Sequence, residues 1–249
     1  MINLRTQREI SKLKDATKIS AQALQVAGEA CRAGVTTWEI DKIVEKFIVS
    51  QGAEPSFLNY QGFPTSSCIS VNDTIIHGIP SKNIILKDGD IVSVDVGAKY
   101  NGYHGDNAFT FKVGEVDQNV SQLLETTEKA LYCGINQAVV GNRIGDISNA
   151  IEKTVDSYGY GIVREFVGHG VGKNLHEEPE IPNFGPAGRG PRLMAGMVIA
   201  IEPMINQGDG GIKHCSDGWT IKTADGKPSA HFEHTILITK NEPIILTKL

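Results

Sequence analysis

The sequence has few cysteines, no long apolar run and no excess of positive charge. Its four cysteines are far apart and form no Cys-x-x-Cys pair, which argues against a disulfide framework and against a structural zinc knuckle. No stretch holds 18 uninterrupted apolar residues, and residues 1–7 lack the apolar core of a signal peptide. A formal net charge of −5 argues against general affinity for nucleic acids. We therefore expect a cytoplasmic protein with free thiols that binds no membrane and makes no direct contact with nucleic acid.

A repeated apolar stretch organises the chain. Residues 88–96 (DGDIVSVDV) recur as residues 195–203 (AGMVIAIEP), so that Glu202 follows Asp95 by 107 residues. Each copy is an apolar, β-branched run after a glycine, which is typical of a strand buried on both faces. A carboxylate in such a setting is costly unless it is paired, protonated or bound to a metal, and its presence in both copies favours a shared role. The alternative is that each acid closes a strand and reaches solvent or a basic partner.

Helical patterns precede each copy of the repeat. Apolar spacing predicts one helix over about 7–33, ended by Gly34, and a second up to Gly52 with its N-cap at Thr36 or Thr37. The glycine, acid and apolar stripe of the second helix recur 107 residues later, over 141–159. We therefore expect one α+β domain over 1–249, built from halves of about 1–113 and 114–249 that are related by a pseudo-two-fold.

The second half contains two further features. A strand is expected over 162–167, directly before Gly168-His169-Gly170. The segment of about 206–227 has no counterpart in the first half and is rich in Gly, Asp and Lys. We expect this segment to be a loop of the kind that often lines an active site.

The predicted pseudo-two-fold brings carboxylates together. Asp95 would meet Glu202, and the next strands would bring in Asp106 and Glu233. Such a cluster cannot stay ionised alone because like charges repel at short distance, so two divalent cations are expected. Oxygen ligands with one imidazole suit Mn, Fe, Co or Zn in a dinuclear site.

Three of the seven histidines are candidates for that imidazole, and each alone is more often a surface or hydrogen-bonded core residue. The candidates are His77, His169 and His176. The other four histidines are interpreted as structural, that is, as surface or hydrogen-bonded core residues; they are His104, His214, His231 and His234.

The order of these residues resembles the pita-bread metallopeptidases, and most closely the type I methionine aminopeptidases. The resemblance covers nearly the whole chain and rests on Val94-Asp95-Val96, His104-Gly105-Asp106, Gly168-His169-Gly170, Ile201-Glu202-Pro203-Met204 and Phe232-Glu233-His234-Thr235. Type II members carry a large helical insertion after the histidine ligand, whereas only 64 residues separate His169 from Glu233 here. The chain is similar to the minimal bacterial form.

The resemblance implies a curved antiparallel sheet shared by the two halves, with a dinuclear metal centre on it. In that family Asp106 and Glu233 bridge the ions, Asp95 completes one ion, and His169 with Glu202 completes the other. Glu202 is also implied as a proton shuttle. His77 and His176 are implied to contact the substrate, and the methionine pocket is implied to include Tyr60, Phe63, Cys68 and Trp219.

Four residues depart from the family's pattern, and all concern the pocket. Gly97 stands for a frequent Thr, Leu175 for an aromatic residue, Phe57 for a frequent Cys and Phe63 for a frequent Tyr. None of them removes a metal ligand.

The implied function is metal-dependent removal of the initiator methionine from nascent proteins whose second residue is small. We expect a monomer that acts near the ribosome. One alternative is a proline-specific peptidase of the same fold, although those relatives normally carry a large N-terminal domain. The other is a non-catalytic binding protein on this scaffold, although such proteins usually lose ligands.

Overall fold

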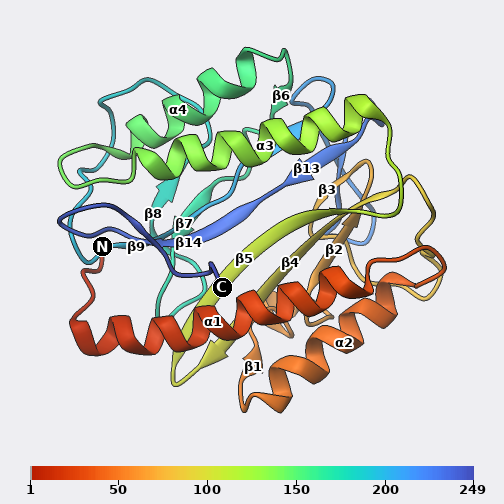
Figure 1. Ribbon diagram of the computed structural model, residues 1–249, viewed down its shortest axis with the longest axis horizontal. Coiled ribbons are helices and arrows are strands. Elements are labelled where there is room, and N and C mark those ends of the chain that lie inside the picture. Colours follow the sequence, from red (N-terminus) through yellow and green to blue (C-terminus); the bar gives the residue numbers. More distant parts are fainter. Residues whose placement is uncertain (1) are drawn as a thin grey trace.

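Two helices precede the main strands in each half of the chain, in a computed structural model that describes residues 2–249 (Figure 1). The helices are α1 (Gln7–Ala30), α2 (Thr37–Ser50), α3 (Gln118–Asn136) and α4 (Ile144–Asp156), with a 3-10 turn at Tyr60–Gly62. The strands of the first half are β1 (Glu54–Pro55), β2 (Cys68–Val71), β3 (Thr74–Ile76), β4 (Ile91–Tyr100) and β5 (Tyr103–Lys112). The later strands are β6 (Gly161–Ile162), β7 (Gly168–Gly170), β8 (Glu177–Ile181), β9 (Val198–Ile201), β10 (Met204–Asn206), β11 (Ile212–His214), β12 (Ile221–Thr223), β13 (Ser229–His231), β14 (Glu233–Leu237) and β15 (Ile244–Ile245).

A nine-stranded antiparallel sheet forms the centre of the molecule. Its strand order is β1-β4-β5-β14-β9-β7-β8, with β2 paired to β4 and β15 paired to β14. Strand β5 of the first half and β14 of the second half are neighbours, so the halves share this sheet. Helices α1 and α3 lie across the same face of it, and α2 and α4 flank them (Figure 1).

The side chains of β4 point alternately to the two faces of the sheet. Val92, Val94, Val96 and Ala98 pack with residues of α1 and α2 in one apolar cluster. Successive side chains of a strand point to opposite faces, so Asp95 and Gly97 face away from these helices. The helices therefore cover one face of the sheet and leave the other for a site.

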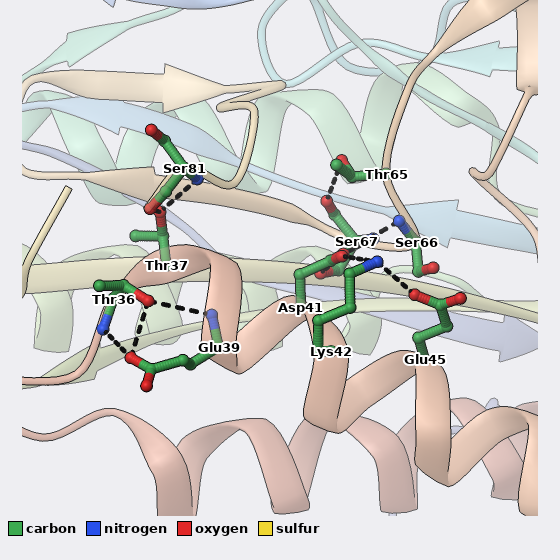
Figure 2. Close-up of polar contacts among 10 residues, drawn as sticks. All are labelled: Thr36, Thr37, Glu39, Asp41, Lys42, Glu45, Thr65, Ser66, Ser67 and Ser81. Carbon is green, nitrogen blue, oxygen red and sulfur yellow. Dashed lines mark hydrogen bonds and ion pairs between the residues drawn. The ribbon is translucent and has the colours of Figure 1, made fainter. Parts of the chain in front are cut away.

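The start of α2 agrees with the sequence. Thr36 is the N-cap, and its side chain accepts a hydrogen bond from the backbone N–H of Glu39 at 3.2 Å. The Glu39 side chain in turn accepts from the Thr36 backbone N–H at 2.8 Å, which completes a capping box (Figure 2). Helix α1 ends at Ala30, slightly before the predicted end, and Gly34 adopts a left-handed φ of 89°.

Two predictions about local structure were wrong. Residues 163–167 do not form a strand, because they link β6, which pairs with β10 in a small sheet, to β7 in the main sheet. The segment 206–227 is not only a loop, because it contains a hairpin of β11 and β12. Strand β12 also pairs with β3 of the first half, and this long-range partner stabilises a strand that local composition does not reveal.

Within 2–249, no helix combines the length and the apolar character that crossing a bilayer needs.

Candidate active site

Strand register gathers three of the predicted carboxylates on the uncovered face of the sheet. Asp95 of β4 and Glu233 of β14 both lie directly across from Ala108 of β5, on opposite sides of it. Asp106 lies across from Gly97. Directly opposed residues share one face, and their Cβ atoms are about 4.5–5.5 Å apart. Because Ala108 is small, the space between Asp95 and Glu233 stays open.

His169 and Glu202 complete this cluster from the other half of the sheet. The Nε2 atom of His169 lies 3.4 Å from Oε1 of Glu202 and 3.8 Å from Oδ2 of Asp106. One possible ligand atom each from Asp106, His169 and Glu233 lies within 4.8 Å of the others. The structure thus brings all five predicted metal ligands together.

The glycines around His169 allow this approach. A Cβ atom on Gly168 would lie 2.3 Å from the carbonyl oxygen of Ala200, and one on Gly170 would lie 2.4 Å from that of Glu178. Only glycine fits between these neighbouring strands at such distances.

The hydrogen bond of the His169 ring fixes which nitrogen faces the carboxylates. Its Nδ1 atom lies 2.9 Å from the carbonyl oxygen of Gly170, which can only accept. Nδ1 therefore carries the proton, and Nε2 presents a lone pair. Burial, assisted by His176, lowers the pKa of His169 to about 3, so the ring is neutral and suited to bind a metal.

The carboxylates are held in a state that resists ionisation. Burial raises the pKa of Asp106 to about 7 and raises those of Asp95, Glu202 and Glu233 well above their usual range. Repulsion from neighbouring carboxylates adds to the shift of the last three.

The donor set fits divalent cations. Among the described residues, one buried oxygen of each carboxylate has no hydrogen-bond partner; these oxygens are Asp95 Oδ1, Asp106 Oδ1, Glu202 Oε1 and Glu233 Oε1. Such buried acceptors are costly unless something positive satisfies them. Four carboxylates with one neutral imidazole match the ligand preferences of Mn, Fe, Co or Zn.

A cavity of about 180 Å³ joins the carboxylates to an apolar pocket. All eleven predicted site residues line it, together with Phe57, Gln61 and Leu175; the eleven are Tyr60, Phe63, Cys68, His77, Asp95, Asp106, His169, His176, Glu202, Trp219 and Glu233. The cluster of carboxylates and imidazole and the apolar pocket are therefore parts of one site.

Aromatic rings form the apolar wall. Phe63 and Trp219 meet edge to face with centroids 5.1 Å apart, and His77 meets Trp219 in the same way at 6.3 Å. At the mouth of the cavity, the exposed His176 has its Nδ1 atom 2.8 Å from the hydroxyl of Tyr60. These contacts fix the orientation of both histidines around the space where a substrate would lie.

His77 has an unusual backbone conformation. Its φ is 56°, in the left-handed region that residues other than glycine seldom adopt. Its ring packs edge to face on Phe166 with centroids 5.6 Å apart. Burial, assisted by His176, lowers the pKa of His77 to about 4, so its imidazole is neutral at physiological pH. Conformational strain of this kind is concentrated at functional sites.

The four residues that depart from the family's pattern lie close together. A Cβ atom on Gly97 would lie 2.7 Å from the ring of Phe57 and 2.7 Å from Cβ of Ser56. Phe57 and Leu175 pack in one cluster with Phe63 and Cys68. The absence of a side chain at Gly97 thus makes room for the Phe57 ring, which supplies aromatic surface beside the aliphatic Leu175.

A buried aspartate on α2 holds the segment that enters the pocket. Asp41 is fully buried, and its Oδ1 atom accepts hydrogen bonds at 2.9 Å from the backbone N–H of Ser66, the backbone N–H of Ser67 and the Ser67 hydroxyl (Figure 2). The next residue is Cys68, which lines the cavity. Helix α2 therefore anchors the start of β2 and with it one wall of the pocket.

Sequence reasoning missed three residues of this region: Asp41, Phe166 and His231. The burial of Asp41 could have been predicted from the sequence, because this residue falls on the same face of the helix as the buried residues Ile40 and Val44. His231 is a core residue, as its structural interpretation expects, but within residues 2–249 its Nε2 atom has no hydrogen-bond partner and lies 3.7 Å from Oε2 of Glu202.

Comparisons with known proteins agree with this geometry. Residues 11–240 match the model of metallopeptidase family M24. A methionine aminopeptidase of Clostridium perfringens is 51% identical over 247 residues, which cover 99% of this chain and 99% of the relative. The crystal structure of a methionine aminopeptidase from Thermotoga maritima matches with a TM-score of 0.98 and 45% identity, covering 100% of each chain. A prolidase from Pyrococcus furiosus has a TM-score of 0.80 and 27% identity, and the match covers 99% of this chain but 65% of the prolidase. The pita-bread fold expected from the sequence is confirmed.

Proposed function

This chain belongs to metallopeptidase family M24, and from that membership we propose that it is a metal-dependent aminopeptidase that removes the initiator methionine from nascent proteins with a small second residue. Full-length similarity to methionine aminopeptidases supports the substrate class. The observation that carries the proposal is that a carboxylate and imidazole cluster adjoins an aromatic pocket within one cavity.

Five residues would hold two divalent ions. By the family resemblance, Asp106 and Glu233 would be shared by both ions, Asp95 would complete one, and His169 with Glu202 would complete the other. Support comes from the short distances from Nε2 of His169 to Glu202 and Asp106 and from the unsatisfied oxygens of the carboxylates. When bound, such an ion pair supplies a strong nucleophile from water at neutral pH and polarises the scissile carbonyl. Mn, Fe, Co and Zn all suit this ligand set.

The remaining roles belong to side chains of this chain. His176 donates a hydrogen bond to the carbonyl oxygen as negative charge develops, and Tyr60 fixes its ring through the 2.8 Å contact. Glu202 accepts and returns the proton of the attacking water. His77 lines the same cavity, where it contacts the substrate and limits the space beyond the scissile bond.

The apolar part of the cavity suits a methionine side chain. A thioether is apolar and polarisable, and its contacts with aromatic rings contribute about 0.3–1.5 kcal/mol each. Tyr60, Phe63 and Trp219 supply such rings, and Cys68 closes the pocket beside the carboxylates.

The site draws on both halves of the chain, which supports one metallopeptidase domain over 1–249 with halves of about 1–113 and 114–249. Asp95 and Asp106 come from the first half, and His169, Glu202 and Glu233 come from the second. Because the repeat supplies its own symmetric partner, we propose a monomer. Because its proposed substrate is the N-terminus of a nascent chain, we propose that it acts in the cytoplasm near the ribosome.

A single comparison of substrates tests this function. Purified protein loaded with Mn²⁺ or Co²⁺ is given a Met-Gly peptide and an X-Pro peptide. Cleavage of Met-Gly alone, abolished by a chelator, supports the methionine aminopeptidase. Cleavage of X-Pro alone would identify a proline-specific peptidase, and metal-independent binding without turnover of either would identify a binding protein.

A further inference from the structure

His231 is a buried histidine that faces Glu202. It ends β13, and only 2% of its surface is exposed. Its backbone is fixed to Thr110 of β5, whose hydroxyl accepts from the His231 N–H at 2.9 Å and donates to the His231 carbonyl oxygen at 2.8 Å. The strand therefore fixes the direction of this side chain, which cannot rotate freely as the side chain of a surface residue can.

The ring of His231 has an unpaired nitrogen. In the part of the chain that the structure describes, its buried Nε2 atom has no hydrogen-bond partner and lies 3.7 Å from Oε2 of Glu202. Two other histidines contrast with it, because Nδ1 of His104 lies 2.9 Å from the Ser56 hydroxyl and Nδ1 of His234 lies 2.8 Å from the Thr247 hydroxyl. A buried ring nitrogen without a partner is unfavourable, and Glu202 is the acid within reach of it.

Glu202 lies between two imidazoles that approach different oxygens. Oε1 faces Nε2 of His169 at 3.4 Å, and Oε2 faces Nε2 of His231 at 3.7 Å. The Glu202 backbone carbonyl also accepts from the Asn183 side chain at 3.0 Å, so the main chain of this residue is held. The orientation of the carboxylate then depends on what each oxygen meets.

We propose that His231 is a positioning residue for Glu202: once the 3.7 Å gap between them closes, its Nε2–H donates to Oε2 and so keeps Oε1 directed toward the metal ligand His169. This inference rests on the proposed function, because it assigns a role toward the metal. Partners that orient a ligand side chain fix its geometry, and their removal typically weakens metal binding about 10–100-fold.

The test is a titration with Co²⁺, followed by calorimetry and by the visible absorption of the bound ion. His231→Leu keeps a similar volume without a donor, whereas His231→Gln keeps an N–H donor. We expect the dissociation constant of the ion bound by Glu202 to rise about 10–100-fold in His231→Leu and to stay within about threefold of the unsubstituted value in His231→Gln.

His234→Gln is the matched control. This histidine is one residue from Glu233, yet it bonds to Thr247 away from the cluster, so its replacement reports general damage to the strand. We expect Co²⁺ binding by this variant to be unchanged. Equal weakening in His234→Gln and His231→Leu would overturn the proposal, because the effect would then be structural.

Two further outcomes are decisive. Unchanged Co²⁺ affinity and absorption in His231→Leu would overturn this inference alone, whereas failure of the unsubstituted protein to bind Co²⁺ would overturn the proposed function as well. If His231→Leu does not fold, His231→Asn replaces it, because its amide keeps the position polar but is too short to reach Glu202. Weak binding by His231→Asn supports the proposal, and normal binding contradicts it.

Discussion

Cys68 of β2 lies directly across from Asp95 of β4, so one cross-strand pair joins the apolar pocket to the carboxylate cluster. Opposed side chains share one face of the sheet, and both residues line the same cavity. Burial and the nearby Asp95 raise the pKa of the Cys68 thiol well above its usual range, so the thiol is uncharged where it lines the pocket. Any shift of β2 against β4 would change the pocket and the cluster together.

The first prediction concerns Asp41, which holds β2 in place. Asp41→Ala leaves three buried donors of Ser66 and Ser67 without their acceptor. Hydrogen bonds to a charged group contribute about 1.5–3 kcal/mol each, so we expect the free energy of unfolding to fall by at least about 3 kcal/mol. We also expect a higher KM for a Met-Gly peptide at 20 °C, measured where the variant remains folded.

Glu45→Gln is the control for Asp41→Ala, because Glu45 is a partly exposed acid on the same helix that pairs with Lys42 (Figure 2). We expect its KM and stability to match the unsubstituted protein. A normal KM in Asp41→Ala would show that α2 does not shape the pocket.

Much of the site could be predicted because the repeat carries the strand pattern. The alternation that buries Val94 and Val96 against α1 also turns Asp95 to the other face, and the same offset identifies Glu202. His231 could not be assigned in this way, since its environment depends on which strands pair with β13. That pairing, Met204 with His231, joins residues 27 positions apart across a segment that had been expected to be a loop. The hairpin of β11 and β12 was missed for the same reason: its partner β3 lies far away in the sequence.

The second prediction tests the bridging carboxylates. We expect Asp106→Ala or Glu233→Ala to abolish turnover of Met-Gly, because each would remove an oxygen pair shared by two ions. A chelator should have the same effect on the unsubstituted protein, and added metal should reverse it. Metal content and kcat are measured together, with Glu152→Gln on α4 as an acid control outside the site. Full activity of either alanine variant in metal-free buffer would contradict a dinuclear centre.

The third prediction separates a metal ligand from a substrate contact. His169→Ala removes the lone pair that faces Asp106 and Glu202, so we expect metal content to fall. His176→Ala keeps those ligands and removes a donor to the developing oxyanion, which typically costs about 10²–10³ in kcat. Elemental analysis of both purified variants is the measurement. Equal loss of metal in the two would contradict the division of roles.

The fourth prediction concerns pH and the metal-free protein. The pKa of Asp106 is raised from 3.8 to about 7 in the folded chain, so between these values the folded chain holds a proton that the unfolded chain releases. Asp106 therefore contributes stability that is lost as pH rises through this window. Histidines that burial keeps neutral, such as His77 and His169, contribute in the opposite direction over part of it. We therefore expect the Tm of the chelated protein to fall between pH 5.5 and pH 8 relative to the Tm of a variant that lacks the Asp106 carboxyl.

Asp106→Asn provides the comparison for this pH dependence, because it removes the titrating group. Its Tm should decline less over the same interval, and saturating metal should reduce the decline in the unsubstituted protein. Identical slopes for the chelated protein and Asp106→Asn would show that Asp106 does not cause the effect.

The last prediction concerns selectivity for the first residue. An apolar pocket discriminates by about 1–3 kcal/mol per methylene, so we expect the kcat/KM of Met-Gly to exceed that of Leu-Gly clearly and that of Ala-Gly by more. Small second residues such as Gly, Ala and Ser should be tolerated, because His77 limits the space beyond the scissile bond. Equal rates for Met, Leu and Ala at the first position would contradict the methionine pocket and leave the metallopeptidase assignment intact.

Phe57 gives this selectivity a structural test, since its ring fills the space beside Gly97 and lines the cavity. Phe57→Ala should enlarge the pocket and raise the kcat/KM of Phe-Gly relative to Met-Gly. The outward-facing Leu58→Ala is the control, because Leu58 is exposed and does not line the cavity. If Phe57→Ala lowers both rates by the same factor, the ring supports the fold of this region without setting the size of the pocket. A change in the ratio alone, with metal content unchanged, identifies Phe57 as the residue that defines how large a first side chain this protein accepts.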